Sequence, residues 1–154
     1  MKLSPDWEYV SDTVMGGVST GEVTHRPVAG RPAARLTGAV SLDNNGGFIQ
    51  MAFDVADGQT VDASVWEGIE FEVRGNAATY EMRLRTDQLA RPWQSFRAAF
   101  DAPTEWSVRR LPFDIFEPHR TDVRFDSARL RRIGVLAIGS EMEADIAICE
   151  TRFY

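Results

Sequence analysis

The fold class follows from one stretch of the sequence, Ile69-Glu70-Phe71-Glu72-Val73-Arg74, in which apolar and charged residues alternate. This period of two places successive side chains on opposite faces of an extended strand, one face buried and the other in water. The same alternation occurs in Tyr80–Arg85 and in Ser95–Phe100. Strands with one wet face are typical of antiparallel sheets, so the sequence predicts an all-β fold.

Turn residues separate these runs from five further strand candidates, which are Ala34–Leu42, Phe48–Val55, Trp106–Leu111, Ile133–Ile138 and Asp145–Phe153. The turn signals are Gly16-Gly17, Asn44-Asn45-Gly46-Gly47, Asp57-Gly58, Gly75-Asn76, Arg91-Pro92 and Ala102-Pro103. Helical signal is limited to one short turn, which Asp126 or Ser127 can cap. Many short strands with regular turns predict a sandwich or barrel, and 154 residues suit a single domain over residues 1–154.

A charged sheet face is a further expectation. If Ile69–Arg74 and Tyr80–Arg85 pair as a hairpin across Gly75-Asn76, their polar faces lie side by side. The patch would then contain Glu70, Glu72, Glu81, Arg83 and Arg85, extended by Arg97. Such a face is either a solvated surface with weak ion pairs or a ligand-binding face.

The composition is that of a globular protein with an acidic surplus. Hydrophobic residues make up 44% of the chain, the formal net charge is −6 and the pI is about 4.9. A nucleic-acid surface would need a concentrated basic patch against this balance, so no nucleic-acid partner is expected. No run reaches the roughly 18 apolar residues of a membrane span, and Met1–Trp7 has no signal-peptide pattern. We therefore expect a cytoplasmic protein without a membrane span.

Catalytic signatures are scarce. His25 and His119 have no cysteine or histidine partners at a metal-binding spacing, and His119 follows Glu117-Pro118, which favours a loop. The single cysteine, Cys149, lies in an apolar run and is expected in the core. Neither a nucleophile elbow nor a phosphate-binding glycine loop is present in the sequence. The sequence predicts no cofactor, no metal and no enzyme, although a small hydrolase would need only two carboxylates facing across a cleft.

Two glycine-rich segments are distinctive, Asp12–Ser19 and Leu42–Phe48. Paired glycines permit positive φ and close backbone approach, so these segments are either tight turns or loops whose exposed amides contact a partner. The side chains of Asp43–Asn45 carry oxygen atoms that could bind calcium, but the preference of Asp and Asn for turns is sufficient to explain their presence here. Met15 is expected to fill one end of the sandwich rather than form an exposed tip.

The order of motifs along the chain resembles a known family. The motifs are Asp12–Ser19, Gly38 with Val40–Leu42, Asn44–Phe48, Trp66–Ile69, Val73–Gly75, Tyr80 with Leu84–Thr86, Trp106, Leu111–Phe113 with Phe116, and Ile133–Val135. Together they resemble the complex I intermediate-associated protein family. The resemblance implies a galactose-binding-like β-sandwich, or jelly roll, of two antiparallel sheets. It also implies kinship with the factor that assists assembly of mitochondrial NADH:ubiquinone oxidoreductase, a chaperone and not an enzyme; without a transit-peptide extension, this chain looks like a stand-alone bacterial member.

Two functions are weighed. The first is a non-enzymatic protein-binding module whose partners, by resemblance, are respiratory complex I subunits or intermediates. The second is a carbohydrate-binding module, for which Trp93 after Arg91-Pro92 is the aromatic residue most expected to be exposed. The candidate contact residues are Asp12, Thr13, Met15, Gly16, Gly17, Asn44, Asn45, Gly46, Gly47, Arg83, Arg85 and Trp93.

Overall fold

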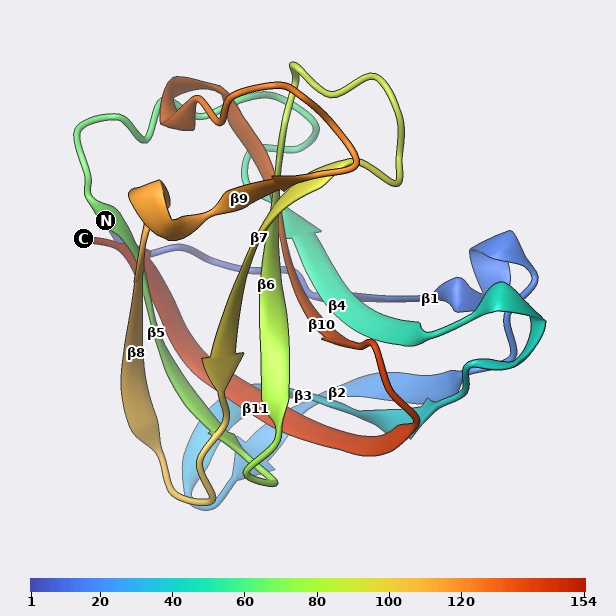
Figure 1. Cartoon of the computed structure of the whole chain (residues 1–154). Coiled ribbons are helices and arrows are strands. Elements are labelled where there is room, and N and C mark those ends of the chain that lie inside the picture. Colours follow the sequence, from blue (N-terminus) through green and yellow to red (C-terminus); the bar gives the residue numbers. More distant parts are fainter.

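The computed structural model describes the backbone of residues 1–154 and every side chain except that of Asn45. In this chain, eleven strands form two antiparallel sheets (Figure 1). The six-stranded sheet has the order β1 (Glu8–Ser11), β4 (Phe48–Asp54), β10 (Leu130–Ile138), β6 (Thr79–Thr86), β7 (Ser95–Asp101) and β9 (Glu117–His119). The five-stranded sheet has the order β2 (Thr20–Val28), β3 (Arg31–Val40), β11 (Met142–Phe153), β5 (Gly68–Gly75) and β8 (Ser107–Pro112).

Helical structure is confined to four 3-10 turns, η1 (Asp12–Met15), η2 (Asp43–Asn45), η3 (Phe113–Ile115) and η4 (Ser127–Arg129). No helix in the described chain has the length and hydropathy needed to cross a bilayer. The predicted cap is confirmed at η4, where Asp126 Oδ1 accepts a hydrogen bond from the Ala128 amide at 3.0 Å.

The predicted alternation is confirmed on both sides of the core. On β5 the residues Ile69, Phe71 and Val73 are at most 1% exposed, and on β6 the same holds for Tyr80, Met82 and Leu84. The two sheets face each other through these side chains, which gives the β-sandwich its single hydrophobic core.

The predicted hairpin is wrong. β5 pairs with β11 and β8, whereas β6 pairs with β10 and β7, so the Gly75-Asn76 link crosses from one sheet to the other. The physical reason is that both strands have an apolar face and cover opposite sides of one core. The predicted charged patch is therefore divided: Glu70 and Glu72 lie on the five-stranded sheet, and Glu81, Arg83, Arg85 and Arg97 on the six-stranded one.

The structure contains three strands that the sequence pattern does not predict, and Cys149 is less buried than expected. β1, β2 and β9 lie at sheet edges and have little regular apolar alternation, which is why the sequence pattern missed them. Cys149 is half-buried rather than in the core, because the β11–β5 ladder shifts register between Ile148 and Thr151. Burial raises the pKa of its thiol, which does not favour a nucleophilic thiolate.

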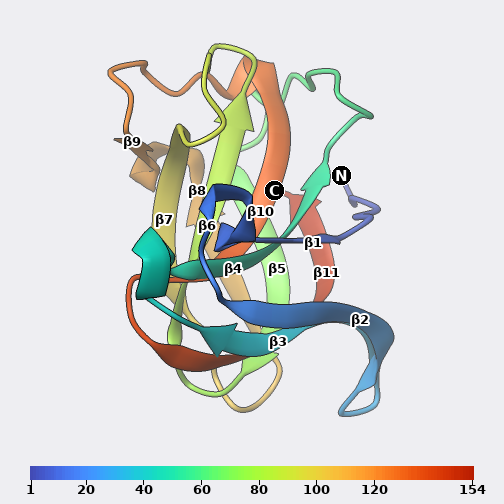
Figure 2. The ribbon, with the colours of Figure 1, turned by 90° about the vertical axis from the view of Figure 1, so that its right-hand side faces the viewer.

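A buried carboxylate joins the two glycine-rich segments at the corner of the molecule that faces the viewer in Figure 2. The Asp12 side chain is fully buried. Its Oδ1 accepts the Ser19 amide at 3.0 Å, and its Oδ2 accepts the Ser19 hydroxyl at 2.5 Å. Oδ2 also accepts the amides of Gly47 at 2.7 Å and Phe48 at 3.3 Å. Asp12 thus ties η1 to the loop that leads into β4.

The neighbouring glycines leave room for this carboxylate. A Cβ at Gly17 would lie 2.4 Å from Asp12 Cγ, and a Cβ at Gly46 would lie 2.5 Å from Asp12 Oδ2. Each Gly-Gly pair therefore contributes one residue whose missing side chain makes space for the carboxylate. The corresponding turns also need Gly16 and Gly47, which have φ of +87° and +142°.

Asp12→Asn is expected to lower the free energy of unfolding by about 2–4 kcal/mol, because one acceptor becomes an amide donor that faces backbone donors. The measurement is the urea midpoint by far-ultraviolet circular dichroism at pH 7. Asp43→Asn, the same substitution on an exposed side chain of η2, is the matched control and is expected to change little. Equal midpoints for the two variants would contradict a structural role for Asp12.

The same network predicts a pH dependence. Burial raises the pKa of the Asp12 carboxyl, but hydrogen bonds from Ser19, Gly47 and Phe48 outweigh it and leave that pKa below its ordinary value. Since the folded-state pKa is the lower one, the network stabilises above the unfolded-state pKa of about 4 and this stability is lost as pH falls through the folded-state pKa. The difference in urea midpoint between the wild type and Asp12→Asn is thus expected to narrow progressively as the pH falls below about 4. If the difference in urea midpoint between the wild type and Asp12→Asn stayed constant across this pH range, the Asp12 carboxylate would not be the source of that difference.

Candidate functional site

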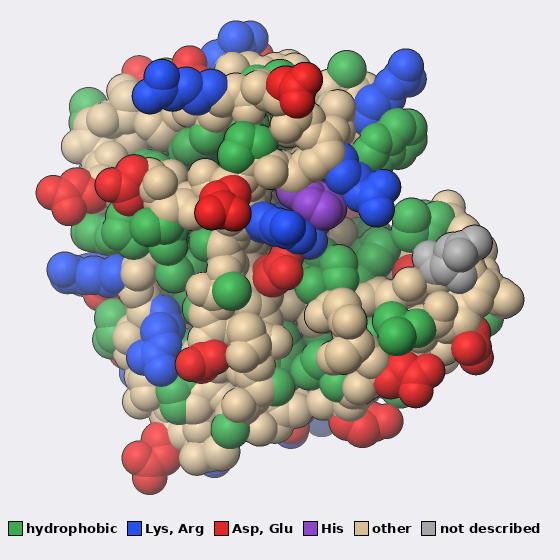
Figure 3. Space-filling view, viewed as in Figure 1, with side chains coloured by type: hydrophobic (Ala, Val, Ile, Leu, Met, Phe, Trp, Pro, Cys, Tyr) green, Lys and Arg blue, Asp and Glu red, His purple; other side chains and the backbone are tan. Residues whose placement is uncertain are grey.

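A groove of about 530 Å³ lies on the outer face of the six-stranded sheet. Residues of β4, β10 and β6 form its base, and its two sides come from the glycine-rich loops and from the loop between β6 and β7. Figure 3 shows this face hollowed between the upper right of the molecule and the projecting corner at the right. Blue and purple side chains gather above the hollow, and green ones lie within it.

Small and aliphatic residues form the base of the groove. Ala52 and Leu136 are 1% and 4% exposed, although they belong to the groove lining and not to the core cluster. Gly134 pairs with Ala52 on one side and with Arg83 on the other, so it lies at the middle of the sheet. A Cβ at Gly134 would meet only the Oε1 of Gln50 within 3 Å, at 2.8 Å. The absence of a side chain here deepens the groove.

Arg83 and Arg85 project from β6 into the groove and are held differently. The Arg83 guanidinium lies 2.7 Å from Glu81 Oε1 and donates to Ser95 Oγ at 3.1 Å. Arg85 Nη1 instead donates to backbone carbonyls of the β6–β7 loop, at 3.0 Å for Arg91, 3.1 Å for Pro92, and also to Gln94. Arg85 therefore fixes the loop that carries Trp93.

Gln94 connects the β6–β7 loop to Arg120, the residue that follows β9. Gln94 Oε1 accepts the amides of Ala90 at 3.1 Å and Arg91 at 3.0 Å, and its Nε2 donates to the Arg120 carbonyl at 3.2 Å. The Trp93 ring stays 54% exposed at the edge of the groove, as the sequence predicts, with the Arg91 guanidinium 6.0 Å from its centroid.

The opposite edge of the groove is also apolar. Met15 of η1 is 55% exposed and Leu42 is 46% exposed, and both line the groove. The expectation that Met15 fills the end of the sandwich is wrong, because the Asp12 network holds η1 outside the sheets. Val14 and Val18 of the same segment are also exposed, at 76% and 47%. Four exposed apolar side chains, those of Met15, Leu42, Val14 and Val18, thus lie on this pair of loops.

The structure brings half of the predicted contact residues together. Met15, Gly46, Gly47, Arg83, Arg85 and Trp93 line the groove. Of the others, Asp12 and Gly17 are buried, Thr13, Gly16 and Asn44 are exposed outside it, and the Asn45 side chain lies outside the described residues. The amides of Ser19, Gly47 and Phe48 donate to Asp12, so the expectation that the amides of these loops meet a partner does not hold for these three.

Sequence reasoning missed the part of the groove that comes from distant strands. Gln50, His119, Arg120, Arg132 and Leu136 line it, and none was a candidate. His119 lies in β9 opposite Ser95, not in a loop as predicted, because Glu117–His119 extends the sheet at its edge. The one available signal was Gly134 inside an apolar strand, which marks close approach of another group.

The site has few groups for catalysis. Among the described residues, no three His, Cys, Asp or Glu side chains are grouped so that they could hold a metal ion. Burial, followed by the charges of Arg83, Arg97 and Arg120, lowers the pKa of His119 below its ordinary value. A neutral imidazole among guanidinium groups is a hydrogen-bonding group in a cationic setting.

Several solved structures of similar fold are carbohydrate-binding modules. A family 11 carbohydrate-binding module from Clostridium thermocellum, in complex with a β-1,3-1,4-mixed-linked tetrasaccharide, matches with a TM-score of 0.76 at 13% identity, over 99% of this chain and 93% of that one. A family 30 module of a cellulosomal cellulase of Clostridium thermocellum matches with a TM-score of 0.69 at 16% identity, over 99% and 94%. At this identity the likeness establishes the galactose-binding-like, jelly-roll sandwich alone.

The sequence carries a more specific match. No curated protein sequence matches the chain. The family model of Complex I intermediate-associated protein 30 matches residues 2–148. These residues include both glycine-rich segments and every strand that lines the groove. The chain therefore belongs to the Complex I intermediate-associated protein 30 (CIA30) family.

Proposed function

We propose that the chain, acting as a single domain, is a non-enzymatic protein-binding module that serves as an assembly factor for respiratory complex I. The groove is its binding site. The observation that carries this proposal is the pair of exposed apolar edges, Met15 with Leu42 on one side and Trp93 on the other, above an aliphatic base. Such edges suit the apolar side chains of a polypeptide. Membership of the Complex I intermediate-associated protein 30 family supports the choice of complex I as the partner.

In this proposal, ten of the twelve predicted residues, all except Asn44 and Asn45, have one of two roles. Met15, Gly46, Gly47, Arg83, Arg85 and Trp93 contact the partner. Asp12, Gly17 and Gly16 hold the first loop in the position from which Met15 reaches the groove. Thr13 supports the same loop through a 2.9 Å hydrogen bond with Ser11 Oγ.

Carbohydrate binding is the second candidate, favoured by exposed Trp93 and by the modules of similar fold. Stacking on aromatic faces is the usual way to bind a sugar ring. The aromatic rings among the described groove residues are those of Trp93, Phe48 and His119, whereas the base is Ala52, Gly134 and Leu136. The aliphatic base favours the protein partner.

Gly134→Phe is expected to abolish partner binding, because its ring would occupy the base of the groove; the added Cβ itself meets only the end of the Gln50 side chain within 3 Å. The measurement is affinity capture of the tagged protein from gently crosslinked native lysate with membranes included, followed by mass spectrometry. We expect the wild type to capture complex I subunits or assembly intermediates. The captured amount is expected to be at least about tenfold lower with Gly134→Phe.

The matched control is Val108→Phe, which adds a ring at an exposed position of β8 on the other sheet. Val108→Phe is expected to capture the same proteins as the wild type, in the same amounts. Absence of complex I subunits from the wild-type capture would sink the assembly-factor proposal. Binding of neutral oligosaccharides in a glycan panel, lost in Gly134→Phe, would then establish the second candidate.

A further inference from the structure

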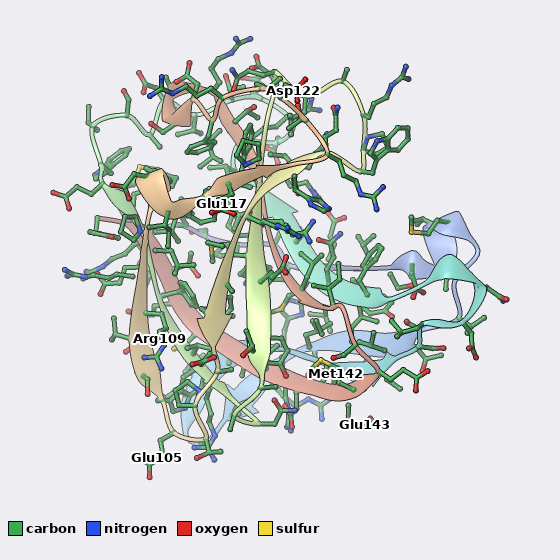
Figure 4. The ribbon with its side chains drawn as sticks, viewed as in Figure 1. Glu105, Arg109, Glu117, Asp122, Met142 and Glu143 are labelled. Carbon is green, nitrogen blue, oxygen red and sulfur yellow. The ribbon has the colours of Figure 1, made fainter. Side chains whose placement is uncertain are left out.

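The groove differs in charge from the rest of the chain. The protein has 23 acidic residues and a net charge of −6. The groove is nevertheless lined by four arginines, Arg83, Arg85, Arg120 and Arg132, together with His119, and by no Asp or Glu among the described residues. Figure 4 labels acidic Glu105 and Glu143 at the lower end of the molecule, and Glu117 and Asp122 in its upper part. Asp122 does not line the groove, but it lines a neighbouring depression together with Arg120.

Two of these arginines have no acidic partner. Arg83 pairs with Glu81 and Arg132 with Asp54, each at 2.7 Å. Arg85 donates to carbonyl groups, which carry no net charge. Among the described side chains, the Arg120 guanidinium has neither an ion pair nor a hydrogen bond. The lining of the groove therefore keeps positive charge at Arg85 and Arg120 that no ion pair among the described side chains neutralises.

The position of Arg120 is fixed by its backbone. Its φ of +58° lies in the left-handed region, which is unfavourable for a residue with a side chain. The hydrogen bond from Gln94 to its carbonyl holds this conformation next to the loop that carries Trp93. A cation and a large exposed ring thus lie on one connected edge of the groove.

We infer that the groove binds an acidic segment of its protein partner, with carboxylates at Arg120 and Arg85 and a large apolar side chain between Met15 and Trp93. This inference rests on the proposed function and adds the chemistry of the partner. Charge complementarity is the argument: guanidinium groups without acidic partners recognise carboxylates, and the apolar edges accept the side chain beside them.

The test is selection of a phage-displayed library of random twelve-residue peptides on the wild-type protein. The selected peptides are expected to contain a higher fraction of Asp and Glu than the starting library. They are also expected to contain a large apolar residue. Binding of the best selected peptide, measured by fluorescence anisotropy, is expected to weaken about three- to tenfold in Arg120→Gln and to fall with added salt. The matched control is Arg109→Gln, on β8 far from the groove (Figure 4), which is expected to bind as the wild type does.

Each other outcome overturns the inference. Selected peptides without acidic excess, whose binding is lost in Gly134→Phe, would refute the acidic preference and leave the groove as a protein site. Equal binding by Arg120→Gln and Arg109→Gln would refute the role of Arg120. Selection of no peptide, with groove-dependent binding of trigalacturonate, would show that the arginines serve an acidic sugar. The lysate capture tests the proposed function separately, so the two failures are distinguishable.

Discussion

The buried Asp12 carboxylate is the interaction on which the functional face depends. It accepts hydrogen bonds from one loop through Ser19 and from the other through Gly47 and Phe48. A buried charge is tolerated only where hydrogen bonds replace its water, and four donors do so here. The consequence is a rigid corner that places Met15 and Leu42 beside the groove instead of in the core.

The opposite edge of the groove is built by a different device. Arg85 and Gln94 satisfy backbone groups of the β6–β7 loop, so Trp93 is exposed without being loosely attached. The base between the two edges is low because Gly134 has no side chain. Preorganised edges on both sides of this base reduce the entropy lost on binding, which suits a module that recognises a partner without reacting with it.

Much of the fold could be predicted from local pattern. Alternation in Ile69–Arg74 identified strands, and the ordered motifs identified the family, now shown over residues 2–148. Pairing could not be predicted, because alternation gives the buried face of a strand but not its neighbour. The proximity of β5 and β6 in sequence suggested a hairpin, whereas the core required them on opposite sheets.

The same limit explains the half-predicted site. Loop glycines and exposed Trp93 carry local signals, so they were found. Arg120 and Arg132 reach the groove only because β9 and β10 pair beside β7 and β4, which no local pattern encodes. The sequence predicts a contact role for Asp12 at the surface, because its sequence neighbours do not reveal that a second loop, more than thirty residues away, encloses it.

The central claim is that the groove contacts a protein of complex I assembly, and site-specific photocrosslinking tests it most directly. Benzoylphenylalanine would replace Trp93 at the groove or Val108 on the opposite sheet, followed by irradiation in cells and mass spectrometry of the adducts. The account predicts adducts with complex I subunits or assembly intermediates from position 93 and none from position 108. Adducts from position 108 alone, or none with these proteins from position 93, would contradict it.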